Sequence, residues 1–172
     1  MKFIINDLQD KTVLNYRLIN KVFAALNKKM PGKLKNHEVI VTLVDDTYLR
    51  RLNKRFLGRD TFTDVIAFPM EESSSPPVKG HKSSTVILGD VVVSVQRAKL
   101  QAAGFKHSFN QELALLIIHG TLHLLGYDDI KVTDAAVMRQ KEQEILETLH
   151  LNAVTRSQRH KVTSRKEKTG DW

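Results

Sequence analysis

Two histidines and an aspartate have the residue types and spacing of a metal site. His119 and His123 are four residues apart, and Asp129 follows six residues later. Side chains at i and i+4 lie on one face of a helix, so both imidazoles can reach one ion. Gly126 lets the chain turn back between His123 and Asp129. The spacing therefore predicts three protein ligands and an open position for water, as in catalytic zinc sites.

The structural alternative is that these histidines are satisfied core residues. A single histidine on an apolar helix is usually of that kind, but two unpaired buried imidazoles on one face would each cost roughly a few kcal/mol. Asp128 competes with Asp129 as third ligand, or else orients a histidine through a hydrogen bond. We predict one Zn²⁺ per chain, held by His119, His123 and Asp129.

The chemistry expected of such a site is hydrolysis. Bound zinc lowers the pKa of a water molecule to about 7, and that water can attack a phosphodiester or an amide. A peptidase of this pattern carries a glutamate directly after its first histidine, whereas this chain has Gly120. The formal net charge of +8 favours an anionic, phosphate-bearing substrate instead.

Composition indicates a soluble globular protein. Of the 172 residues, 41% are hydrophobic and 27% are charged, and none is cysteine, which excludes disulfides and thiolate metal ligands. The N-terminus does not resemble a signal peptide, and no apolar run approaches the roughly 20 residues of a membrane span. We therefore expect a cytoplasmic protein without a membrane partner.

The pattern along the chain predicts one α+β domain over residues 1–150. We expect strands at 2–6, 37–44, 63–69 and 85–95, and helices at 14–30, 47–56, 95–104, 109–125 and 133–149. Asp45-Asp46 can cap the second of these helices, and Thr133 is expected to cap the last. The fold would be a roughly four-stranded mixed sheet covered by about five helices. Ser108 and Gln111 form a capping-box pattern before the fourth helix, whose apolar residues place it in the core, with the metal site at its end. Residues 151–172 form a basic tail that we expect to be disordered.

The histidine segment closely resembles the signature of the YbeY family. Residues 119–129 read HGTLHLLGYDD, and ten of the eleven positions fit the family pattern His-Gly-x-Leu-His-Leu-x-Gly-Tyr-Asp-His. Two upstream segments are also similar, Leu52-Asn53 leading to TDVIAFP at 63–69, and LGDV at 88–91. The resemblance covers roughly residues 1–150.

The resemblance implies a single-strand-specific, metal-dependent endoribonuclease with one zinc ion. It further implies work on ribosomal RNA precursors together with the small ribosomal subunit, in late 16S rRNA 3′-end maturation and ribosome quality control. A ribosome-assembly factor with a structural metal and little catalysis is the alternative. A metalloprotease-like hydrolase is disfavoured by Gly120.

Two positions depart from the family pattern. Asp129 replaces the usual third histidine; a carboxylate is an acceptable zinc ligand, but its charge should alter metal preference and weaken activation of the bound water. Leu57 stands where the family usually has an arginine proposed to meet RNA phosphate. Arg55 and Arg59 flank that position and are our candidates for phosphate contacts, although both could simply face solvent. If Phe56–Gly58 lies at a turn, Arg59 is the better candidate.

Four other ionisable residues carry weaker expectations. Asp64 and Asp90 are expected to anchor backbone turns near the groove. Glu112 could approach the metal from two helical turns away, but we expect it to favour the dipole in the first turn of its helix. His107 is expected to be solvated.

Overall fold

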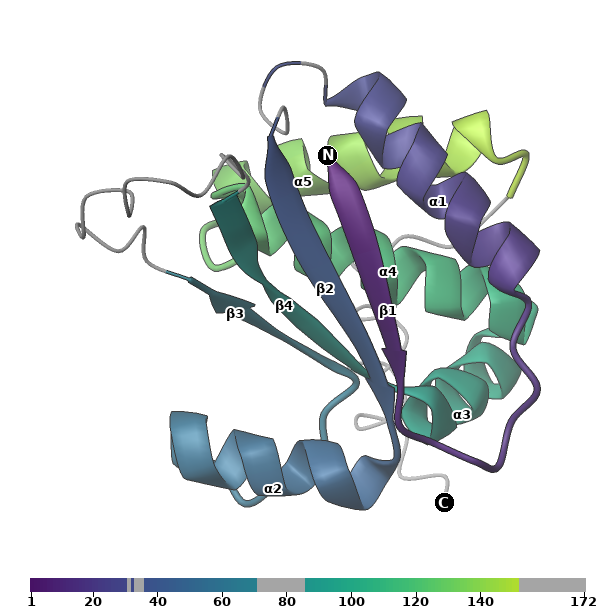
Figure 1. Cartoon of the computed structure of the whole chain (residues 1–172), viewed down its shortest axis with the longest axis vertical. Helices are drawn as coiled ribbons and strands as arrows, with labels where there is room; N and C mark the ends of the chain where they lie inside the picture. Colours follow the sequence, from purple (N-terminus) through teal and green to yellow (C-terminus); the bar gives the residue numbers. More distant parts are fainter. Residues whose placement is uncertain (31, 33–35, 71–85, 152–172) are drawn as a thin grey trace, which may run out of the picture.

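The computed structural model describes residues 1–30, 32, 36–70 and 86–151 (Figure 1). Within these residues four strands form one sheet: β1 (Lys2–Asp7), β2 (His37–Val44), β3 (Val65–Pro69) and β4 (Val86–Ser94). Their order is β1-β2-β4-β3, with β1, β2 and β4 parallel and β3 antiparallel to β4. The predicted basic tail, the polar stretch at 71–85 and His81 within it lie outside the described residues, save for position 151.

Five helices in the described part of the chain accompany the sheet: α1 (Tyr16–Lys29), α2 (Asp46–Leu57), α3 (Val95–Phe105), α4 (Phe109–Leu124) and α5 (Val132–Thr148). The α+β architecture predicted from the sequence, with a four-stranded mixed sheet and five helices, is confirmed. No helix in the described part of the chain is long and apolar enough to cross a membrane.

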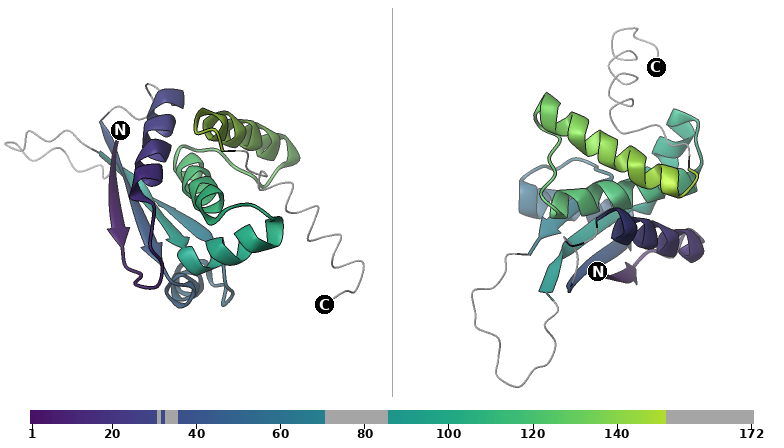
Figure 2. Two further views of the ribbon diagram at one scale, coloured as in Figure 1. Left: turned by 90° about the vertical axis from the view of Figure 1, so that its right-hand side faces the viewer. Right: turned by 90° about the horizontal axis from the view of Figure 1, so that it is seen from above.

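Alternation along the strands divides the core between the two faces of the sheet. One face carries Val39, Val41 and Leu43 of β2 with Val91 and Val93 of β4, and it packs against α1, α3, α4 and α5. The opposite face carries a smaller cluster, in which Val44 and Val92 meet Leu49 of α2. Helices thus crowd one side of the sheet, while α2 covers only one end of the other (Figure 2).

Helix α4 is the central helix of the crowded layer. It lies on β3 and β4 and is flanked by α1, α3 and α5. The predicted capping box is present, because Ser108 Oγ accepts the Gln111 N–H and Gln111 Oε1 accepts the Ser108 N–H. Buried residues run along nearly its whole length. A helix apolar on every face is stable only inside a core. Because α4 is buried in this way, it is held in one orientation relative to the sheet and the neighbouring helices.

Two local details differ from or sharpen the expectations. Thr133 was expected to cap α5, but the N-cap is Lys131, without a side-chain cap, and Thr133 instead donates to Asp134. Gly89 lies at an irregularity in the β2–β4 register. A Cβ there would collide with the Phe68 carbonyl oxygen and approach Leu124 Cδ2 to 2.7 Å, so the glycine permits close packing of β3, β4 and α4.

Candidate metal centre

Helix α4 brings its two histidines to one point near its C-terminal end. The Nε2 atoms of His119 and His123 lie 3.0 Å apart. His119 is buried, at 3% exposure, whereas the side chain of His123 is half-buried. The rings are nearly perpendicular, so the two nitrogens converge on a common point without stacking.

Asp129 reaches the same point from the loop between α4 and α5. Its Oδ2 lies 3.8 Å from His119 Nε2, and its Oδ1 lies 3.9 Å from His123 Nε2. One ligand atom from each residue falls within 4.8 Å of the others. The Asp129 side chain is 46% exposed, so the cluster runs from the buried His119 through the half-buried His123 to Asp129 at its open side.

The outer nitrogens of both imidazoles already have partners that determine which nitrogen carries the proton. His123 Nδ1 lies 3.0 Å from the Tyr127 carbonyl oxygen, which can only accept a hydrogen bond. His119 Nδ1 lies 2.6 Å from Glu142 Oε1, and a carboxylate likewise accepts. Each Nδ1 therefore donates, so the Nε2 of each ring is the nitrogen left to bind a metal ion.

Two ring nitrogens 3.0 Å apart can share a proton or bind one cation, and the donor set fits a divalent metal. Imidazole nitrogens and a carboxylate oxygen are common zinc ligands. Two nitrogens bound tetrahedrally to one zinc ion lie about 3.3 Å apart, which is close to the observed separation of 3.0 Å. With three protein ligands and an exposed side, the site resembles catalytic rather than closed structural zinc sites.

Asp128, the competing third ligand, instead accepts backbone hydrogen bonds within the loop. Its Oδ1 accepts the N–H groups of Asp129, at 2.7 Å, and Ile130, at 3.3 Å. This turn shapes the loop that presents Asp129. Among the described residues, the carboxylate that contacts the outer nitrogen of a metal-site histidine is Glu142 and not Asp128.

Glu112 and His107 form a separate buried pair at the opposite end of α4. His107 Nε2 and Glu112 Oε2 are in very short contact, and Glu112 has no exposed surface. The expectation that His107 is solvated is therefore wrong, since its side chain is only 5% exposed. Glu112 does lie in the first turn of α4, as expected.

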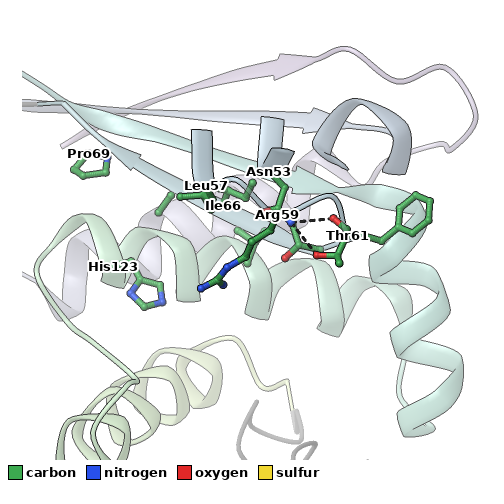
Figure 3. A pocket seen from close by; sticks show the side chains of 11 residues that line it. Asn53, Leu57, Arg59, Thr61, Ile66, Pro69 and His123 are labelled. Atoms are coloured by element: carbon green, nitrogen blue, oxygen red, sulfur yellow. Dashed lines mark hydrogen bonds between the residues drawn. The ribbon is translucent and has the colours of Figure 1, made fainter. Parts of the chain in front are cut away.

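A cleft of about 460 Å³ opens beside the metal cluster (Figure 3). Its lining includes His123 from α4, Leu57 and Arg59 from the end of α2, and residues of β3. Gly58 ends α2 with a left-handed backbone conformation, φ +69°, which turns the chain so that Arg59 points into the cleft. Arg59 and His123 are thus contributed to one cleft by distant parts of the chain.

The segment that carries Arg59 is tied to α2 by a buried amide. Asn53 is 4% exposed, and its Nδ2 donates to the Thr61 carbonyl oxygen at 2.9 Å. The Asn53 carbonyl also accepts the Arg59 N–H at 3.3 Å.

Arg55, by contrast, does not line the cleft and lies over the Phe56 ring, with its Cζ 5.3 Å from the centroid. The two candidate arginines therefore occupy different environments.

Asp64 and Asp90 support the strands around this region. Asp64 Oδ1 accepts the Val65 N–H and Oδ2 accepts from Gln101, which fits the expected role in a backbone turn. Asp90 instead accepts from the Thr42 hydroxyl on the neighbouring strand, at 2.9 Å. Burial raises the pKa of the Asp90 carboxyl, and this hydrogen bond offsets part of that increase.

Comparisons with known proteins identify the family to which this chain belongs. The family model described as endoribonuclease YbeY matches residues 4–150. The chain belongs to the YbeY family. The endoribonuclease YbeY of Desulforamulus reducens is 40% identical over 154 residues, covering 88% of this chain and 99% of the relative. That of Clostridioides difficile is 36% identical over 153 residues, covering 88% and 98%.

A solved structure shows the same fold. The solution structure of TM1509 from Thermotoga maritima has a TM-score of 0.57 and 24% identity, covering 86% of this chain and 91% of that one. The family model and the curated relatives confirm the family resemblance stated from the sequence. The structure shows one further residue at the metal site, Glu142, which the sequence did not lead us to expect. Its signal was a glutamate at helical spacing from Met138, Ile145 and Leu146, within the apolar stripe of α5.

Proposed function

We propose that this protein is a zinc-dependent endoribonuclease that cleaves single-stranded ribosomal RNA precursors. The observation that carries the proposal is the convergence of His119, His123 and Asp129 on one point beside a cleft that Arg59 also lines. The family name adds the reaction type. A bound zinc ion would supply Lewis acidity and a water molecule with a pKa of about 7.

One wall of the cleft would bind the metal ion, and the other would bind the phosphate of the RNA. His119, His123 and Asp129 would hold the metal. Arg59, on the other wall, would bind a phosphate through its planar guanidinium. Because Arg59 is exposed, its charge is available to a strand that enters the cleft. A single strand can place a phosphate against both walls more readily than a stiff duplex can.

The biological assignment extends this chemistry. We propose 16S rRNA 3′-end maturation and ribosome quality control in the cytoplasm, in contact with the small ribosomal subunit. The net charge of +8 supports an RNA partner, and the curated relatives are named endoribonucleases.

The test is cleavage of a 16S rRNA precursor by the full-length, zinc-loaded protein. A single-stranded oligonucleotide and its duplex serve as further substrates, and His123→Ala is compared with His150→Asn as a control at an exposed histidine. We expect cleavage of the single strand that His123→Ala abolishes and His150→Asn leaves intact. Equal cleavage by His123→Ala would overturn the proposal.

The same experiment distinguishes the alternative of an assembly factor with a structural metal. In that case wild type would bind zinc, neither protein would cleave RNA, and His123→Ala would only be less stable. The 46% exposure of the Asp129 side chain favours the enzyme, because structural zinc sites are closed on all sides.

A further inference from the structure

Glu142 of α5 is a buried carboxylate that contacts a predicted metal ligand. Its exposed fraction is 1%, and its Oε1 lies 2.6 Å from Nδ1 of His119, which is itself 3% exposed. The second oxygen, Oε2, is buried without a hydrogen-bond partner among the described residues. The carboxylate thus makes one short hydrogen bond and is otherwise poorly solvated.

The position of Glu142 is one where packing alone would favour an apolar side chain. Met138 lies four residues before it, and Ile145 and Leu146 lie three and four residues after it, so all four share one face of α5. The three apolar members are essentially inaccessible and belong to the main core. Burying a carboxylate there with one oxygen unpaired is costly, and core stability does not account for it.

The two imidazoles are held by different partners. The Nδ1 of His123 faces a neutral backbone carbonyl at 3.0 Å, whereas that of His119 faces a carboxylate at 2.6 Å. Hydrogen bonds to an ionised acceptor are shorter and roughly twice as strong as neutral ones. A carboxylate behind a histidine also makes its other nitrogen a better electron-pair donor.

We propose that Glu142 is a positioning residue that orients His119 and strengthens it as a metal ligand. It acts through His119 and does not itself touch the ion or the RNA. This inference rests on the metal site in the proposed function. It implies that zinc affinity depends on α5, an element that contributes none of the three proposed ligands.

The experiment measures zinc affinity by competition with a chromophoric chelator. Glu142→Gln keeps the size of the side chain and an acceptor oxygen but removes the charge, and Glu142→Leu replaces the carboxylate with an apolar group suited to the core. Glu147→Gln makes the same chemical change at an exposed position of α5 and is the matched control. Thermal unfolding of each metal-free variant shows whether the fold is retained.

We expect zinc affinity to fall about 10- to 100-fold in Glu142→Gln and at least as far in Glu142→Leu, with Glu147→Gln within about twofold of wild type. Glu142→Leu should lose zinc affinity without losing stability, which a merely structural role would not produce. Unchanged affinity in Glu142→Gln would overturn the inference while leaving the metal site intact. If the wild-type protein itself binds no zinc, the proposed function is overturned, and this inference with it.

A measurement on the wild-type protein does not depend on variant folding. In the zinc-loaded chain, proton NMR should place the His119 Nδ1–H further downfield than the His123 Nδ1–H, because only the former is shared with a carboxylate. The opposite order would contradict the role of Glu142.

Discussion

Gly120 of α4 packs directly against Val91 of β4. A Cβ built at Gly120 would fall well inside van der Waals contact with Val91 Cγ1 and lie 3.1 Å from Val65 Cγ2. The glycine therefore lets α4 approach the sheet closely, immediately beside His119. A peptidase of this motif needs a glutamate at position 120, and here the sheet occupies the space that its side chain would need. Packing thus supports the argument against proteolysis that the sequence suggested.

We predict that Gly120→Ala destabilises the protein by about 1–3 kcal/mol, because β-branched side chains in a packed core cannot move aside freely. Gly104→Ala is the control: it lies in α3 with open space around its Cβ, and alanine there should raise stability by up to about 1 kcal/mol. Urea unfolding measures both. A Gly120→Ala variant as stable as wild type would show that α4 and β4 can separate at little cost.

A strong zinc ligand at position 129 should determine how much zinc stabilises the fold. At a zinc concentration 100 times the dissociation constant, binding adds about 2.7 kcal/mol, or roughly 5–10 °C in Tm for a domain of this size. We expect Asp129→Asn to lose most of this zinc-dependent rise and Asp129→His to retain it, since imidazole is also a zinc ligand. Asp10→Asn, at an exposed loop position, should behave as wild type. A full rise in Asp129→Asn would remove Asp129 from the ligand set.

Arg59 and Arg55 should differ in their effect on RNA binding, because only Arg59 lines the cleft. We expect Arg59→Ala to weaken binding of a single-stranded RNA and to reduce the slope of log K against log salt by about 1, as for one lost phosphate contact. Arg55→Ala should change both quantities less. Filter binding over a salt series provides the measurement, and equal effects of the two substitutions would argue for a diffuse basic surface.

Asp90 should make stability depend on pH. Its pKa in the folded protein is raised above 3.8, chiefly by desolvation, so the folded state binds this proton more tightly than the unfolded state. The associated stability is present below pH 3.8 and is lost as pH rises through the folded pKa. Asp90→Asn should therefore be more stable than wild type at about pH 7, with a difference that shrinks toward about pH 4.

Asp60 provides a control of opposite sign. Lys54 and Arg50 lower the pKa of its carboxyl through hydrogen bonds, so Asp60→Asn should bring no gain near neutral pH. Urea midpoints at both pH values test the pair. An Asp90→Asn advantage that grows on acidification would contradict the assigned sign.

Local sequence signals predicted most of the fold. The Ser108 capping box, the Asp45 cap of α2 and the bounds of β2 were evident because caps and alternation depend only on neighbouring residues. The spacing of His119 and His123 likewise fixed their shared face. The cap of α5 was misassigned because Thr133 bonds Asp134 instead of the backbone.

Contacts between distant residues could not be predicted in this way. Glu142 meets His119 from another helix, and nothing in the spacing of the two residues indicates their contact. His107 sits in a polar stretch, yet a buried partner on α4 removes it from solvent. Which of the two arginines enters the cleft depended on the direction of the turn after α2, at Gly58.

The two walls of the cleft differ in how the chain assembles them. The three proposed ligands and Glu142 all lie within residues 119–142, an αα-hairpin made of the end of α4, the loop after it and the first part of α5. The wall with Arg59 comes from a segment about sixty residues before His119, and it meets this stretch where α4 packs against β3. The metal half of the site is therefore complete within one continuous peptide, which makes residues 119–142 a natural unit for transplantation onto another helical hairpin.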